Sequence, residues 1–258
     1  MKKEYYFVSW NVNGVRAIAR KDALHWVDEE VPDILGLQEI KAEKEQIPNN
    51  LFEHSFANTI VSSSEKKGQS GVAIFSDIKI DYSSPCYSVD ILKEGRINEI
   101  HFDNIAFFNV YFPNGKRSTE RLAYKMKFYE RFFDHIELLR KKGMSIIFCG
   151  DVNTAHNPID IARPKDNENI SGFLDIERAW IDKLMSAGYI DTFRYIHKNE
   201  ANRYSWWSMR TRARGRNVGW RIDYFFVSAD LKEDIVDADI LDTVMGSDHA
   251  PIILRLKK

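Results

Sequence analysis

Cysteine is scarce in this sequence. Cys86 and Cys149 are the only two in 258 residues. No CxxC pair is present, which argues against a zinc ribbon or a thioredoxin-like motif. Two cysteines give no disulfide framework, and this composition is typical of a protein that folds in a reducing compartment. Cys149 ends an apolar run, so we expect it to be a small core residue and not a reactive thiol.

Long apolar runs and a charge excess are also lacking. No segment approaches the length that spans a membrane, and no apolar signal segment follows the N-terminus. We therefore expect a cytoplasmic or nucleoid-associated protein with no targeting signal and no membrane partner. Lys and Arg number 37 against 38 for Asp and Glu, giving a net charge of -1. A nucleic-acid partner must therefore be argued from local charge.

The order of predicted elements indicates an α/β protein. Hydrophobic residues make up 44% of the chain, enough for one large core, and we expect a single domain over 1–258. Strands are predicted over 5–10, 34–38, 57–62, 71–76, 96–102, 105–111, 145–150, 222–227, 235–241 and 251–256, and helices over 22–30, 118–140 and 175–187. Because these strands alternate with both helices and hairpins, we expect mixed sheets packed together with helices outside.

The stretch from Ser145 to His156 is the most informative one. It begins as a short apolar run typical of a buried strand, and Gly150 is predicted to turn the chain sharply. Asp151 and Asn153 follow directly, and their oxygens suit Mg²⁺ or Mn²⁺. A polar turn that caps the strand explains the same residues equally well, so other parts of the chain must decide.

The same construction recurs, because polar residues follow several apolar runs. The residues concerned are Asn11, Glu39, Tyr111, Asp151 with Asn153, and Asp248 with His249, while Asp223 lies inside a predicted strand. Ligand sites in layered α/β folds gather outside the carboxyl ends of strands. Several carboxylates in one cleft repel one another unless a cation neutralises them, and oxygen ligands favour magnesium or manganese over zinc.

Such a cleft suits the hydrolysis of a phosphate ester. Asp151 can act as general base on the attacking water, and Asn153 can hold that water or the phosphate. His249 can donate to a phosphoryl oxygen while Asp223 fixes its tautomer, and Tyr111 can stabilise the developing charge. Each residue also has an alternative without a catalytic role. Tyr111 can simply pack in the core, Asp223 can be a buried hydrogen-bonded strand residue, and Asp248 and His249 can belong to an ordinary turn.

Residues 203–221 combine arginines with tryptophans. The stretch contains six arginines and no acid, together with Trp206, Trp207 and Trp220. Arginines bind phosphates and aromatic rings stack on sugars or bases, so the stretch favours a nucleic-acid surface. Alternatively the arginines pair with the acidic segment 230–242, and the tryptophans, Trp207 in particular, belong to the core.

Six motifs in family order resemble the exonuclease III family of abasic-site endonucleases. They are Ser9-Trp-Asn-Val-Asn-Gly14, Leu37-Gln-Glu-Ile-Lys41, Tyr111-Phe-Pro-Asn114, Gly150-Asp-Val-Asn153, Asn217-Val-Gly-Trp-Arg-Ile-Asp-Tyr224 and Gly246-Ser-Asp-His249. The resemblance covers nearly the whole chain and implies a four-layered, DNase I-like α/β sandwich. It also implies a monomeric, Mg²⁺-dependent DNA repair nuclease, with Mn²⁺ able to substitute. The implied substrate is double-stranded DNA with abasic or 3′-blocked lesions, cleaved 5′ to the abasic site, with 3′-to-5′ exonuclease or 3′-end processing.

The resemblance also assigns roles to individual residues. It implies a metal site formed by Asn11, Glu39, Asp151, Asn153, Asp248 and His249. It implies that Tyr111, Asp151, Asn153, Asp223 and His249 carry the chemistry. The residues implied to contact the substrate are Asn114, Trp206, Arg210, Trp220 and Ile222. Some members carry Asp at the position of Asn13, so this chain departs from them near the metal.

Two other functions remain open on the sequence alone. The same fold can serve an inositol phosphate or sphingomyelin-type phosphodiesterase, although a small headgroup does not need an extended basic surface. The chain can also be a DNA-binding module with an inactive site, although each expected catalytic residue type is present.

Overall fold

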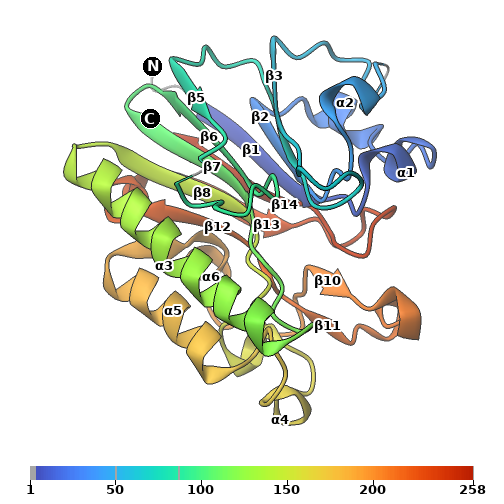
Figure 1. The fold of residues 1–258 in the computed structure, drawn as a ribbon, viewed down its shortest axis with the longest axis vertical. Coiled ribbons are helices and arrows are strands. Elements are labelled where there is room, and N and C mark those ends of the chain that lie inside the picture. Colours follow the sequence, from blue (N-terminus) through green and yellow to red (C-terminus); the bar gives the residue numbers. More distant parts are fainter. Residues whose placement is uncertain (1–3, 50, 87, 258) are drawn as a thin grey trace.

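Two six-stranded sheets form the centre of the molecule (Figure 1). The structure is a computed structural model and describes residues 4–49, 51–86 and 88–257. The first sheet has the order β13-β14-β1-β2-β4-β3, with β1 (Glu4–Asn11), β2 (Ile34–Gln38), β3 (Asn58–Ser62), β4 (Val72–Ser76), β13 (Ile235–Ile240) and β14 (Ile252–Lys257). The second has the order β5-β6-β7-β8-β12-β9, with β5 (Tyr82–Ser84), β6 (Ile97–Phe102), β7 (Ile105–Tyr111), β8 (Ser145–Asp151), β9 (Tyr189–Asp191) and β12 (Asp223–Ser228). Both sheets are mixed, because β1/β2 and β7/β8 are parallel pairs among antiparallel ones.

Side-chain alternation along the strands builds a core on each face of the second sheet. In β7, Ile105 and Phe107 pack between the two sheets, whereas Ala106 and Phe108 pack on the outer face. Successive side chains of a strand point to opposite faces, so one fully apolar strand serves both cores. Cys149 of β8 lies in the core between the sheets, which confirms its prediction as a core residue.

Helices cover the two outer faces (Figure 1). Helices α1 (Val15–Ala19) and α2 (Trp26–Glu30) pack on the first sheet, and α3 (Thr119–Lys141) and α5 (Asp175–Ser186) pack on the second. In α3 the four residues predicted to face the sheet, Phe128, Phe132, Ile136 and Leu139, are all buried. The smaller elements are α4 (Pro164–Asn167), α6 (Thr192–His197), and the paired strands β10 (Trp206–Trp207) and β11 (Gly219–Trp220). The predicted four-layered α/β sandwich is confirmed.

The N-terminal helix prediction is wrong in its extent. Residues 22–30 were expected to form one helix, but α2 covers only the second half, and α1 precedes it. Asp22 has a φ of 53°, a left-handed conformation that ends a helical run. Short helices of this kind are fixed by the apolar residues they bury, here Val15 and Ile18 in α1, and not by propensity.

Gly150 also acts differently from its prediction. Strand β8 does not turn at Gly150 but continues through it to Asp151. Gly150 has a φ of 128°, and a Cβ atom there would lie 2.0 Å from the carbonyl oxygen of Val110 in β7. The glycine is therefore required by the close approach of the neighbouring strand.

Strand register brings the polar strand ends to one pole of the molecule. Tyr111 pairs with Asp151 across the parallel strands β7 and β8, and Asp223 pairs with Asp151 across β8 and β12. Asn11 of the first sheet donates a hydrogen bond of 3.0 Å from Nδ2 to Oδ2 of Asp151. Both sheets therefore contribute side chains to this pole. Among the described residues, no helix combines the length and apolar character needed to cross a bilayer.

Candidate active site

A cavity of about 110 Å³ opens at the shared pole of the two sheets. The residues that line it are Glu39, Tyr111, Asn114, Lys116, Asp151, Asn153, Gly172, Trp206, Trp220, Ile222, Asp248 and His249. Ten of these were among the predicted site residues. Of the remaining predicted residues, Asn11 and Asp223 contact the lining directly, and Arg210 lies outside.

Asp151 is buried at the floor of the cavity and is held by amide groups. Its Oδ2 accepts hydrogen bonds from Nδ2 of Asn11 at 3.0 Å and Nδ2 of Asn153 at 3.1 Å, and its Oδ1 accepts from the Asn153 N–H at 2.8 Å. Burial raises the pKa of Asp151 to about 7, against the opposing effect of His249. A carboxylate with such a pKa can accept a proton near neutral pH.

His249 lies between two carboxylates. Its Nδ1 is 2.8 Å from Oδ2 of Asp223, and its Nε2 is 3.9 Å from Oδ2 of Asp151. Ser205 fixes the Asp223 side chain with a 2.6 Å hydrogen bond. Burial alone lowers the pKa of His249, but Asp223 outweighs this effect and raises that pKa to about 10. The imidazole is therefore a charged donor at neutral pH.

Glu39 and Asp248 supply further carboxylate oxygens to the cavity. Oε1 of Glu39 accepts from Nδ2 of Asn11 at 3.2 Å, and Oε2 pairs with Lys41 at 2.9 Å. Oδ1 of Asp248 accepts from Nδ2 of Asn13 at 2.9 Å. Burial opposes ionisation of both acids, but Lys41 beside Glu39 and His249 beside Asp248 hold their pKa values below the usual range.

Tyr111 and Asn153 are fixed by hydrogen bonds beside these acids. The Arg96 guanidinium lies 4.6 Å from the centre of the Tyr111 ring and donates to its carbonyl oxygen at 2.9 Å. Burial raises the pKa of Tyr111 well above its ordinary value, so the phenol remains a donor. Asn114 donates at 2.8 Å from Nδ2 to Oδ1 of Asn153, which leaves the Asn153 amide oriented by Asn114 and Asp151 together.

Aromatic and aliphatic side chains form the cavity wall. The rings of Trp206 and Trp220 are 6.1 Å apart at 87°, and Ile222 packs with Trp220. The Trp206 indole donates a 3.0 Å hydrogen bond to Oδ2 of Asp248. A Cβ atom on Gly172 would lie 2.9 Å from the Trp220 ring, so glycine is required for this close approach. The cavity therefore joins an apolar wall to a polar floor.

Comparisons with known proteins identify the family. The family model described as "Endonuclease/Exonuclease/phosphatase family" matches residues 8–249. The chain belongs to this family. An exodeoxyribonuclease of Bacillus subtilis is 44% identical over 255 residues, covering 96% of this chain and 97% of the relative. The DNA repair nuclease APEX1 of Danio rerio is 36% identical over 256 residues, covering 96% and 81%.

A solved structure extends this comparison to the fold. The AP endonuclease of Archaeoglobus fulgidus has a TM-score of 0.85 and 29% identity, covering 97% of this chain and 98% of that chain. Within the endonuclease/exonuclease/phosphatase family, the resemblance to the exonuclease III group of abasic-site endonucleases is confirmed, and the chain is a nuclease.

Members of this family depend on a metal, and the donor set of this chain fits one. The carboxylates of Glu39, Asp151 and Asp248 line one cavity, and the Asn11 side chain contacts Glu39 and Asp151. Carboxylate and amide oxygens are the donors that hard divalent cations prefer.

The predicted basic surface is only partly present. Arg221 is buried and paired with Asp160 and Asp191, and Arg203 pairs with Asp239 in the acidic segment. Trp207 belongs to the core between the sheets. Arg203 and Trp207 follow the predicted alternative, whereas Arg221 pairs with acids outside the segment 230–242. Arg210 is exposed on the short 3-10 turn Met209–Thr211 and remains a candidate for DNA contact.

Lys116 lines the cavity but was not among the predicted site residues. Its Nζ lies 4.7 Å from the ring centre of Trp220 and 5.3 Å from that of Trp206. Burial lowers the pKa of this amine. The sequence places Lys116 in a polar loop after Asn114, and a loop lysine carries no signal for a position over two aromatic rings. His156, which has no predicted role, lies 2.7 Å from Oδ1 of Asp182 through its Nε2.

Proposed function

We propose that this DNA repair nuclease hydrolyses the phosphodiester on the 5′ side of an abasic site in duplex DNA and leaves a 3′-hydroxyl. One observation carries the proposal: a proton acceptor, Asp151, and a charged donor, His249, lie at the floor of a cavity walled by Trp206 and Trp220. The names of the relatives, which include DNA repair nucleases and AP endonucleases, support the substrate class.

The size of the cavity favours a sugar without its base. Pockets that accept drug-sized ligands have volumes of about 300–1,000 Å³, whereas this one has about 110 Å³. Trp206, Trp220 and Ile222 offer an apolar surface that suits the carbon skeleton of a deoxyribose. We therefore assign selection of the lesion to these three side chains.

Proton transfer is assigned to the buried acid. Asp151 accepts the proton of the attacking water, and the Asn153 amide, fixed by Asn114, positions that water or the phosphate. His249 donates a hydrogen bond from Nε2 to a phosphoryl oxygen, because Asp223 holds Nδ1 and keeps the ring charged. The Tyr111 hydroxyl donates to the negative charge that develops in the transition state.

Glu39 and Asp248, with the Asn11 side chain beside Glu39, are the residues that would hold the metal. We propose magnesium, for which manganese can substitute, because the donors are oxygens. When bound, this cation polarises the phosphoryl oxygen and offsets charge on the leaving group. Asn13 is uncharged, so this side of the cavity carries one negative charge fewer than in members with Asp there.

We further propose that the same site trims 3′ ends, since one of the relatives is named an exodeoxyribonuclease. We also propose that the enzyme acts as a monomer. The competing small-headgroup phosphodiesterase is disfavoured by the two-tryptophan wall, and a catalytically inactive module is disfavoured by the complete set of acids and donors.

The test is a nicking assay on a duplex with one tetrahydrofuran abasic analogue. We expect cleavage with Mg²⁺ or Mn²⁺, none with EDTA, and a product that a DNA polymerase extends, since it ends in a 3′-hydroxyl. The matched control is the same duplex with an ordinary nucleotide in place of the analogue. Equal cleavage of both duplexes would contradict the role of the cavity wall, and no cleavage with either metal would contradict the proposed function.

A further inference from the structure

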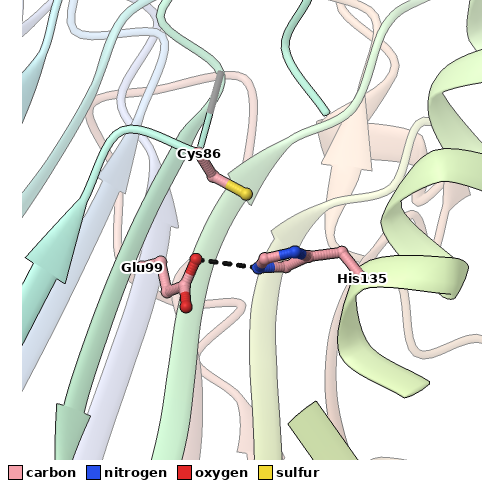
Figure 2. A group of neighbouring side chains, drawn as sticks. All are labelled: Cys86, Glu99 and His135. Carbon is pink, nitrogen blue, oxygen red and sulfur yellow. Dashed lines mark hydrogen bonds and ion pairs between the residues drawn. The ribbon is translucent and has the colours of Figure 1, made fainter. Parts of the chain in front are cut away.

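A second cluster of metal-binding side chains lies on the outer face of the second sheet, beneath α3. It consists of Cys86 in the loop after β5, Glu99 in β6 and His135 in α3 (Figure 2). Their ligand atoms, Sγ, a carboxylate oxygen and a ring nitrogen, all lie within 4.8 Å of one another. Cys86 is 3% exposed and Glu99 is 2% exposed, whereas the His135 side chain is partly exposed.

The Glu99 carboxylate is the centre of this cluster. One of its oxygens is 2.9 Å from Nε2 of His135, and the other is 2.7 Å from Nε2 of His101. Figure 2 shows the Cys86 sulfur directed toward the Glu99 and His135 pair from above. The same sulfur lies 3.8 Å from the Ser88 hydroxyl, a long polar contact. A thiol, an imidazole and a carboxylate thus converge from three separate elements.

We propose that Cys86, Glu99 and His135 bind a zinc ion. A thiolate with an imidazole selects zinc over magnesium, which prefers oxygen donors alone. Zinc bonds to these donors at about 2.0–2.3 Å, and ligand atoms already grouped within 4.8 Å need only small movements to reach them. The fourth position is left for water. His101 orients the carboxylate through its second oxygen, as partners outside a metal's ligands commonly do.

This site is chemically distinct from the cavity that carries the nuclease residues. The cavity lining contains no cysteine, whereas the proposed zinc site depends on one. Binding of zinc displaces the thiol proton to the solvent, so the Cys86 sulfur becomes a thiolate ligand. The competing interpretation is that Glu99 simply neutralises two histidines, with Cys86 as an apolar neighbour.

Zinc at this site would fasten a loop that leads to Arg96, which contacts the cavity residue Tyr111. The Asp90 N–H donates to the carbonyl oxygen of Cys86 at 3.1 Å, and Asp90 accepts from the Arg96 N–H at 2.9 Å. Arg96 in turn holds Tyr111, as described above. A bound cation therefore ties the sheet, α3 and the loop together and stabilises the support of Tyr111.

Cobalt substitution tests the site without relying on activity. Co²⁺ is added to the full chain with excess Mg²⁺ present, and the near-ultraviolet absorption of a cobalt–thiolate bond is recorded. We expect that band in the unaltered protein and in Cys149→Ala, which removes the other cysteine, and we expect its loss in Cys86→Ser. Absence of the band in the unaltered protein, or its persistence in Cys86→Ser, overturns the proposal.

Zinc titration against a chromophoric chelator supplies the second measurement. Cys86→Ser and His135→Gln should each weaken zinc binding by about tenfold or more, and zinc should raise the unfolding temperature of the unaltered protein but not of these variants. Circular dichroism at room temperature verifies that each variant is folded. Equal zinc affinity in all proteins overturns the proposal. Neither readout requires DNA, so this result stands apart from the nicking assay.

Discussion

The Trp206 indole donates a 3.0 Å hydrogen bond to Oδ2 of Asp248, which links the cavity wall to an acid proposed to hold the metal. Asp248 is also held by Asn13 through its other oxygen. Hydrogen bonds of this type orient a ligand before the cation binds. We therefore expect recognition of the sugar and affinity for the metal to be coupled through Trp206.

Trp206→Phe tests this coupling. The substitution keeps an aromatic wall but removes the N–H donor, so the concentration of Mg²⁺ needed for half-maximal nicking should rise by roughly tenfold. Trp220→Phe is the matched control, since it changes the same wall without touching that hydrogen bond. A metal-dependence curve that is the same for Trp206→Phe and the unaltered enzyme would exclude the coupling.

Asp151→Asn tests the proposed general base. Asparagine occupies the same volume but cannot accept the proton of the attacking water, so the rate of nicking should fall by roughly 10²–10⁴-fold. Binding to the abasic duplex, measured by fluorescence anisotropy with EDTA present, should persist. Asp182→Asn, a change at the largely exposed partner of His156, serves as control. Full activity of Asp151→Asn would assign proton transfer to another group.

Arg210→Ala tests the exposed part of the arginine-rich stretch. Arg210 is free to reach a phosphate, whereas Arg221 is buried against the protein's own acids. Loss of one phosphate contact should weaken duplex binding and flatten its salt dependence by about 0.9 in the logarithmic slope. Lys142→Ala, at the far end of α3, should leave the slope unchanged. An unaltered slope for Arg210→Ala would place this residue away from the DNA.

Asp160 makes folding stability depend on pH. Burial opposes its ionisation, but Arg221 at 2.7 Å and Arg194 at 2.6 Å lower its pKa to about 2. An unfolded aspartate has a pKa of about 3.9. Because the folded pKa is the lower one, the stabilisation is present above about pH 4 and is lost as the pH falls through about 2. Its magnitude is on the order of 2 kcal/mol.

Urea unfolding of Asp160→Asn measures this contribution. The variant should lose about 3–5 kcal/mol at pH 7, since it leaves Arg221 buried with one partner fewer. Its stability should then fall less steeply between pH 4 and pH 2 than that of the unaltered protein. Asp175→Asn is the control, because that side chain is 97% exposed. Parallel pH profiles for Asp160→Asn and the unaltered protein would contradict the assignment.

The sequence predicted the strands, the two long helices and the convergence of the site better than the short helices and the partners of the arginines. Apolar runs mark β1, β7 and β8 clearly, and the residues after them reach one pole because parallel strands end together. A sequence shows which residues are charged but not which distant residues form ion pairs with them. The sequence alone suggests that Arg221 contacts DNA, but in the structure it pairs with Asp160, which lies 61 residues away in the chain.

Contacts between distant segments explain the remaining misses. Gly150 was expected to turn the chain. Glycine is instead required at this position because the Val110 carbonyl on the adjacent strand leaves no room for a side chain. Lys116 lines the cavity because its amine lies over the rings of Trp206 and Trp220, which are distant from it in the sequence. The individual roles of Glu39, Asp151 and His249 are still predictions, because their placement together fits those roles without measuring them.

The hydrogen bond from Asn11 to Asp151 crosses from one sheet to the other. Each half of the sandwich thus carries only part of the proposed set of reactive groups. We therefore expect nicking to require both sheets to be packed together, since neither sheet alone holds all the acids of the cavity.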